Sequence, residues 1–327
     1  MKRRTLLQAA AGSAAAWLPA TQVQAQDKDV IRLVSGFAAG GTTDSLCRIL
    51  ADHLAVELGA TVIVETKAGA GGRLAAEHVK NARPDGKTFL VGPDGWAIFP
   101  SAMYTPAELR YDVLKDLQTV GQLVTYPLAL VVNGQVPARN LTEFADWLKR
   151  NPSQASFGTP APNGQIQYVG WLVGQALGTP LEPIVYKGNA PMLLDLMSGQ
   201  VPSAVLVAGD AAKQPREKVR MLGVLAEQRW ALAPDVPTFK EQGFPIRVDE
   251  AWQGMWAPAG APATALTRME QALRTVLSKS EVRQDIVAKL TVTPAFVSAS
   301  ALENKLKESI THWRDVIRRS GYRATGN

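Results

Sequence analysis

One short segment near the start of the chain combines residue types that could hold an anion. A β-branched run is followed by a glycine-containing turn, and a helix is expected to begin directly after it. Gly40 and Gly41 allow the backbone to approach a ligand closely, Thr42 or Thr43 can cap the helix, and Asp44 lies in its first turn. Exposed N–H groups and the helix dipole would both favour negative charge there. A structural turn before a capped helix explains the same residues, so the pattern alone leaves both interpretations open.

Motifs for nucleotide binding and for catalysis are missing from the sequence. It contains no Gly-x-Gly-x-x-Gly, no phosphate-loop ending and no Gly-x-Ser-x-Gly, and the glycines of 69–72 are interpreted as a tight connection. Cys47 is the only cysteine, which excludes an internal disulfide and a cysteine metal cluster. His53, His78 and His312 fit no metal-ligand spacing. We therefore expect no cofactor, no metal and no catalytic residue, although scattered triads keep a secreted hydrolase or isomerase as an alternative.

The N-terminus indicates export. Lys2, Arg3 and Arg4 precede a modest apolar run, and a Val-x-Ala site ends at Ala25. This arrangement predicts a signal peptide over residues 1–25, and its paired arginines resemble the twin-arginine signal. The apolar run is too short to span a bilayer. We expect a periplasmic protein.

Composition bounds the remaining possibilities. The 327 residues are 46% hydrophobic and 20% charged, enough for two compact domains. The formal charge is +6, but the N-terminal segment supplies three of the positive charges. The remaining surplus is small and no basic block occurs, so we expect no nucleic-acid partner.

Strand and helix patterns alternate along the mature chain. β-Branched runs near residues 30–34, 61–65 and 88–91 alternate with helices beginning near 42 and 74, and the rhythm returns between 128 and 225. A strand over 251–257 and three helices follow. The pattern predicts two α/β units, each a mostly parallel sheet flanked by helices, with a ligand cleft between them at the carboxyl ends of the strands.

Several ordered segments carry a family resemblance. They match motifs of the Bug-type receptors of tripartite tricarboxylate transporters, over nearly all of the mature chain. The segments are Phe37–Asp44, Gly69–Gly72, Pro84–Thr88, Tyr186–Pro191, Gly199–Val201, Pro234–Thr238 and Ala257–Pro262.

The resemblance implies a two-lobe periplasmic binding protein of the Venus-flytrap, type II class. Residues 26–125 plus 250–327 would form the first lobe and 126–249 the second. Such a receptor would bind a small mono- or dicarboxylate between the lobes, as a monomer without enzymatic activity. It would deliver the ligand to integral-membrane permease subunits. A sensing component that passes occupancy to a signalling receptor has the same sequence features.

The resemblance also implies which residues meet the ligand, partly through bound water. The first jaw would consist of Ser35, Phe37, Ala39, Gly40, Gly41, Thr42 and Asp44, and the second would include Lys187, Gly188 and Asn189. Asp44 would either fix its own loop or accept a hydrogen bond from a ligand hydroxyl.

Three departures from the family pattern affect the expected ligand. The segment Thr159–Gln167 differs from the family's Gly-Ser-x-x-His-like stretch, and Thr159 and Gln165 are added to the candidate site. Pro202 and Ser203 stand where an aspartate is usual. Trp96 occupies a place where small polar residues are common. It would either pack as a surface aromatic or stack on an aromatic or long apolar ligand. These departures argue against a citrate-like ligand.

Overall fold

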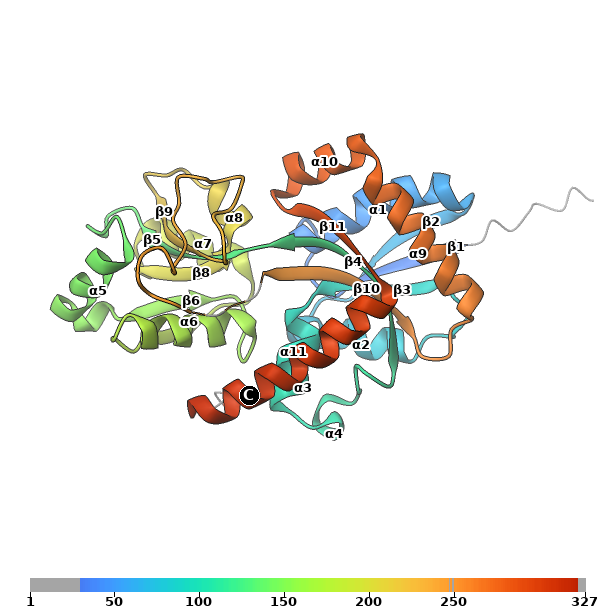
Figure 1. Ribbon diagram of the computed structural model, residues 1–327, viewed down its shortest axis with the longest axis horizontal. Coiled ribbons are helices and arrows are strands. Elements are labelled where there is room, and N and C mark those ends of the chain that lie inside the picture. Colours follow the sequence, from blue (N-terminus) through green and yellow to red (C-terminus); the bar gives the residue numbers. More distant parts are fainter. Residues whose placement is uncertain (1–29, 247, 249, 323–327) are drawn as a thin grey trace, which may run out of the picture.

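The computed structural model describes residues 30–322 apart from 247 and 249, so the expected signal peptide lies outside the described residues. Within this part of the chain the strands form two sheets, one of six strands and one of five. Each sheet with its helices forms one lobe, and Figure 1 shows the two lobes side by side with strands crossing between them. None of the helices described is long and apolar enough to cross a membrane.

The sheet of the first lobe has the order β11-β4-β10-β3-β1-β2. The strands are β1 Val30–Ser35, β2 Thr61–Thr66, β3 Thr88–Pro93, β4 Leu117–Tyr126, β10 Ala251–Pro258 and β11 Thr293–Ser298. Both faces are covered. Helices α1 Thr42–Leu58, α9 Ala263–Ser278 and α10 Ser280–Leu290 bury one face, and α2 Arg73–Lys80, α3 Gly95–Met103 and α11 Ala299–Ser320 bury the other. The short helices η1 Ala70–Gly72 and α4 Pro106–Leu109 lie in connections.

The sheet of the second lobe repeats this plan in the order β7-β6-β8-β5-β9. Its strands are β5 Leu128–Asn133, β6 Ser156–Thr159, β7 Glu182–Val185, β8 Ser203–Val207 and β9 Val219–Leu225. Helices α5 Leu141–Arg150 and α6 Gln165–Ala176 pack on one face, while α7 Asn189–Ser198 and α8 Ala208–Ala212 pack on the other. The short helix η2 Pro152–Gln154 precedes β6.

The amphipathic pattern of the first helix explains its packing. Five apolar residues recur at helical spacing, and all five are buried against the first sheet: Leu46, Ile49, Leu50, Leu54 and Leu58. The helix ends where Gly59 adopts the left-handed conformation and its N–H bonds back to the last turn. Its position fixes where the loop after β1 must lie.

Two strands join the lobes and pair with each other. β4 runs out of the first lobe and continues through Pro127 into β5, while β10 returns from the second lobe. They are antiparallel over registers from Ala251↔Tyr126 to Pro258↔Leu117. Figure 1 shows both strands reaching toward the second lobe.

The predicted two-lobe α/β fold is confirmed, but the expectation that each sheet is mostly parallel is wrong in detail. In the first sheet β1 is parallel to β2 and β3, whereas β10 and β11 pair antiparallel with their neighbours. In the second sheet β5 is antiparallel to both β8 and β9. For β5 and β10 the reason is topological, because each enters its lobe from the other lobe and runs against neighbouring strands that begin within it. The division at 125/126 and 249/250 stays a prediction.

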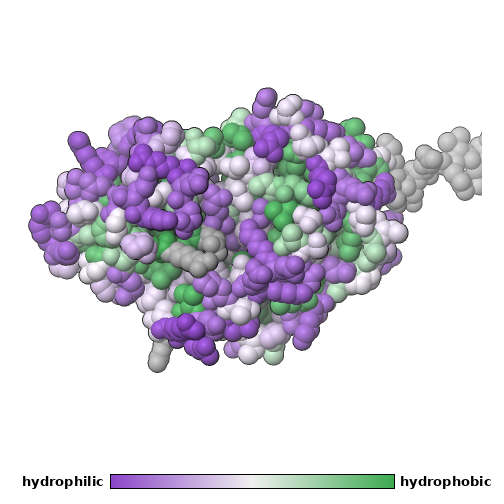
Figure 2. Space-filling view, in the orientation of Figure 1, coloured by the Kyte–Doolittle hydropathy of each residue, from purple (hydrophilic) through white to green (hydrophobic). Residues whose placement is uncertain are grey.

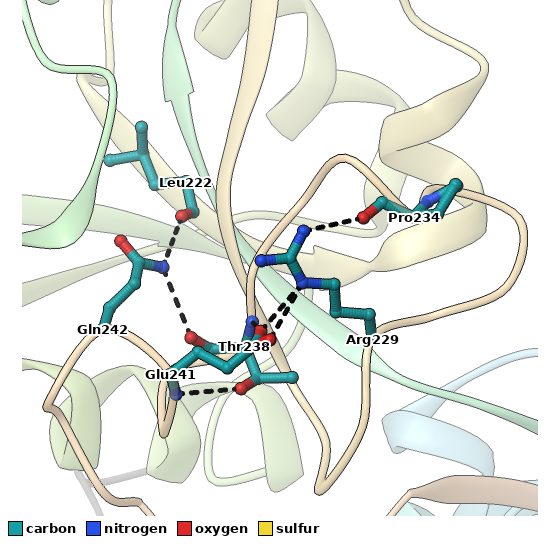
Figure 3. Close-up of polar contacts among 6 residues, drawn as sticks. All are labelled: Leu222, Arg229, Pro234, Thr238, Glu241 and Gln242. Atoms are coloured by element: carbon teal, nitrogen blue, oxygen red, sulfur yellow. Dashed lines mark hydrogen bonds and ion pairs between the residues drawn. The ribbon is translucent and has the colours of Figure 1, made fainter.

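The connection after β9 contains no helix or strand among its described residues and is held by side chains. Glu241 accepts hydrogen bonds from Arg229 Nε at 3.0 Å and from the Thr238 N–H at 2.7 Å, while Thr238 Oγ1 accepts from the Glu241 N–H (Figure 3). Gln242 Nε2 donates to the Leu222 carbonyl at 2.9 Å, which ties this connection to β9. These backbone and guanidinium donors lower the pKa of Glu241. The 234–238 motif therefore stabilises the conformation of this connection.

The two lobes touch at a glycine. A Cβ atom on Gly209, in α8, would lie 2.5 Å from the carbonyl oxygen of Thr291, which follows α10 in the first lobe. Nearby, Lys213 Nζ lies 3.4 Å from the Leu290 carbonyl oxygen. The close approach of α8 to the end of α10 thus requires glycine at position 209, because any side chain there would meet the backbone of Thr291.

Replacing Gly209 with alanine should disturb this approach without harming the helix, since alanine is the better helix former. Overpacking typically costs about 1–3 kcal/mol. We expect that loss in the free energy of unfolding, or a larger radius of gyration in solution scattering as the lobes move apart. Ala212→Ser, exposed on the same helix, is the matched control. Unchanged stability together with an unchanged radius would contradict the contact.

Candidate functional site

The candidate site lies where the carboxyl ends of parallel strands from both sheets face each other. β1 and β3 end there in the first lobe, as do β6, β7 and β8 in the second, and a helix follows each of these strands. Two contacts show that the facing ends meet. A Cβ on Gly95, at the start of α3, would lie 3.3 Å from Gln165 Oε1 at the start of α6, and Asn163 Nδ2 donates to the Tyr104 hydroxyl at 3.0 Å. The predicted site residue Gln165 therefore touches the first lobe.

Three of these helices have a glycine as their N-cap residue. The N-cap residues of α1, α6 and α7 are Gly41, Gly164 and Gly188, and none has a side chain to accept a bond from the first-turn N–H groups. Such N–H groups have no partner within a helix and carry the positive end of its dipole. They are a ready site for a carboxylate, which can accept several N–H bonds at once.

The loop between β1 and α1 is held by Asp44. This side chain is only 2% exposed, and it accepts hydrogen bonds from the Gly40 N–H at 3.0 Å and from Arg48 Nε at 2.9 Å. Its pKa is lowered, chiefly by the Arg48 bond and also by the Gly40 N–H. Thr66 Oγ1 lies 3.5 Å from its other oxygen. Asp44 thus fixes its own loop, one of the two roles expected for it.

The rest of the first jaw surrounds this loop. Ser35 is fully buried at the end of β1, and its Oγ lies 3.3 Å from the Phe37 N–H that donates to it. Gly40 has a φ of 79°, a conformation that suits glycine. Ala39, Gly40 and Gly41 are exposed, and Thr42 and Phe37 are half-buried. The turn therefore presents backbone rather than large side chains to its surroundings.

The second jaw joins two loops of the other lobe. The Gly188 N–H donates to the Pro160 carbonyl at 2.9 Å, which ties the start of α7 to the segment after β6. Thr159 is buried and its Oγ1 donates to the Ala161 carbonyl at 3.1 Å. Asn189 Nδ2 donates to Asp210 Oδ2 at 3.1 Å, and Lys187 is exposed. The structure brings these residues to one region of the second lobe, and their role in binding stays a prediction.

Trp96 is a core residue rather than an open platform. It is 3% exposed, and its ring meets Trp256 at 4.9 Å between centroids and Tyr111 at 6.1 Å. Glycines make room for it: a Cβ on Gly92 would lie 2.7 Å from its Nε1. The surface position expected for Trp96 is wrong, and its predicted role in binding stays a prediction.

Sequence reasoning missed two acids at the same facing ends. Asp94 directly follows β3 and is 3% exposed, and Asp210 lies at the start of α8, after β8. Burial raises the pKa of Asp94 to about 7, although N–H groups of Trp252 and Gly95 and the charge of Lys305 oppose this. Burial also raises the pKa of Asp210. Both residues could have been found from their position, because each comes just after a predicted strand.

The described residues offer no reactive thiol and no metal-binding group. Cys47 is fully buried in α1, and burial raises the pKa of its thiol, which keeps it protonated. Among the described residues, no group of histidine, cysteine and acidic side chains could hold a metal ion. A surface depression of about 510 Å³ lies at the other end of β4 and β10, away from the second lobe, and is lined in part by Leu117, Ala259 and Glu303. It is separate from the facing strand ends.

The fold and this site define a class: a two-lobe periplasmic binding protein of type II. The family model for the tripartite tricarboxylate transporter family receptor matches residues 46–322, and the chain belongs to this family. The resemblance to Bug-type receptors is confirmed.

Three solved structures are among the similar proteins. The periplasmic binding protein BugD is 30% identical, with a TM-score of 0.80 over 89% of this chain and 97% of its own. MatC from Rhodopseudomonas palustris, solved with bound malate, is 28% identical, with a TM-score of 0.76 over 88% and 98%. Another protein from R. palustris, solved with adipate, is 25% identical, with a TM-score of 0.81 over 89% and 97%. These neighbours are solute-binding proteins.

Replacing Asp94 with asparagine should change how stability depends on pH. Between about pH 4 and 7 the folded protein retains a proton on Asp94 that the unfolded chain has released, so wild-type stability falls as pH rises. The variant has no such proton. We expect its stability relative to wild type to increase by about 2–3 kcal/mol from pH 5 to pH 8, measured by urea unfolding without ligand.

Asp52→Asn is the control for this experiment, since Asp52 is exposed on α1. Its stability should run parallel to that of wild type across the same range. If the difference between Asp94→Asn and wild type were constant from pH 5 to pH 8, the buried acid would not have a raised pKa.

Proposed function

We propose that this receptor captures a small mono- or dicarboxylate between its lobes and delivers it to integral-membrane permease subunits. It acts as a periplasmic monomer and releases the ligand chemically unchanged. The observation that carries the proposal is the set of glycine-capped helix N-termini, α1 from one lobe and α6 and α7 from the other, at the facing strand ends. Malate and adipate in two structural neighbours support a carboxylate ligand.

The electrostatics of the helix ends explain how a carboxylate would be held. Each uncapped helix supplies several N–H donors and about half a positive charge, fixed in place before the ligand arrives. Lys187 is exposed at the second jaw and adds positive charge there. Because the donors come from both lobes, a carboxylate between them would favour the closed arrangement over an open one.

The export signal and the surface fit this role. The expected signal peptide over residues 1–25 would direct the chain to the periplasm, where other members of the family act. Figure 2 shows that hydrophilic residues cover much of the visible face, with smaller hydrophobic areas between them. We expect closure around the ligand to create the surface that the permease subunits recognise.

A panel of organic acids tests the ligand class. In a thermal-shift or calorimetric titration, an acid that binds only the folded protein should stabilise it by about 2.7 kcal/mol at a hundredfold excess over its Kd. Thr42→Asp should abolish most of this effect, because a negative charge in the first turn of α1 repels the ligand while it favours the helix itself.

The matched control places the same charge at another helix start. Ser280 is the exposed first residue of α10, and Ser280→Asp should leave binding as in wild type. If no carboxylate stabilised the wild-type protein while another class of solute did, the proposed ligand class would be wrong. If Thr42→Asp bound acids as tightly as wild type, α1 would not hold the carboxylate.

A further inference from the structure

Two buried acceptor atoms near the strand ends that face the second lobe have no hydrogen-bond partner in the part of the chain that the structure describes. Asp94 Oδ1 has no hydrogen-bond partner among the described residues, although the Asp94 N–H donates to the Trp252 carbonyl at 2.8 Å. Gln253 stands opposite Pro93 in the β10–β3 register, is 2% exposed, and its Oε1 is also without a partner in the described chain. Both residues thus lie at the end of the sheet that faces the second lobe. Leaving such buried acceptor atoms unpaired is unfavourable, because each has given up its hydrogen bonds to water.

Asp210 of the second lobe lies near the same strand ends, because the Ala208 N–H at the start of α8 donates to the carbonyl of Pro127, which follows β4, at 3.0 Å. Tyr126 ends β4 at this edge, and burial raises the pKa of its hydroxyl. The negative charges of Asp94 and Asp210 raise that pKa further, so acids from both lobes act on one tyrosine. The positive charge of Lys305 in α11 opposes the rise in the pKa of Asp94, and that of Lys213, which follows α8, opposes the rise in the pKa of Asp210. Asn189, beside the glycine cap of α7, orients Asp210 through its hydrogen bond.

The chemistry of these atoms sets what can bind them. Carboxylate oxygens and an amide oxygen only accept hydrogen bonds when the acids are ionised. A ligand carboxylate is also an acceptor, so it would be repelled here and belongs at the helix N-termini. A group with N–H or O–H bonds is the complement, and an ammonium would also compensate the buried negative charge.

We propose that Asp94, Gln253 and Asp210 form a second subsite, which takes a hydrogen-bond-donating hydroxyl or ammonium group of the ligand. This proposal rests on the proposed function, because the ligand's carboxylate occupies the helix N-termini. The preferred ligands are therefore hydroxy- or amino-carboxylates rather than unsubstituted acids. Discrimination follows because an unsubstituted acid leaves the buried acceptors unpaired.

Matched acids test the subsite. Propanoate and butanedioate are compared by calorimetry at pH 8 with their 2-hydroxy and 2-amino derivatives. In at least one series a substituted acid should bind wild type about tenfold or more tightly than the parent acid. Which derivative binds better distinguishes a hydroxyl site from an ammonium site. Equal or tighter binding of the parent acids would overturn the proposal.

Variants assign the preference to these residues. Asp94→Asn and, from the other lobe, Asp210→Asn should reduce the preference to within about threefold while the parent acid still binds; each keeps the shape of the side chain. Asp52→Asn should retain the full preference. An unchanged preference in both variants would overturn the subsite and leave the proposed function intact. If no acid bound wild type, the proposed function itself would fail, and the subsite with it.

Discussion

The antiparallel pairing of β4 with β10 is the constraint on which the rest of the structure depends. Both strands leave one sheet at the edge where its parallel strands end, so the two lobes are joined at their carboxyl-end faces. The helices that follow β1, β3, β6, β7 and β8 then begin on the side that faces the other lobe. Chain connectivity thus brings backbone donors from distant parts of the sequence to one region before any ligand is present. The same pairing limits how far the lobes can separate.

The facing ends combine two opposite electrostatic environments. The uncapped starts of α1, α6 and α7 favour negative charge, whereas Asp94 and Asp210 disfavour it and attract donors. An ionised acid buried without a partner is costly, and the raised pKa of Asp94 expresses that cost. A ligand with a carboxylate at one end and a donor at the other would satisfy both environments. Asp44 takes no part in either environment, because its carboxylate already accepts hydrogen bonds from Arg48 and Gly40 and holds its own loop.

Local patterns in the sequence predicted those strands and helix faces that are determined by residues close together in the chain. The β-branched runs became β1, β5 and β9, and the apolar spacing of α1 placed its buried face, because both effects involve residues close in sequence. β4 was missed, since Gln118, Gly121 and Gln122 interrupt its apolar pattern. Two of these residues are explained by contacts with β11, which is distant in the sequence. Gly121 leaves room for Phe296, and Gln122 donates a hydrogen bond to the Ala295 carbonyl. Trp96 was misjudged for the same reason, because packing against β10 and α11 buries its side chain.

A crystal structure with a bound hydroxy- or amino-carboxylate tests the central claim most directly. We predict that the ligand lies between the lobes, with its carboxylate within about 3.2 Å of first-turn N–H groups of α1 and of α6 or α7. The lobes should contact each other through the ligand at these strand ends. A carboxylate held mainly by lysine or arginine side chains, or bound in the depression beside Leu117 and Glu303, would contradict this account.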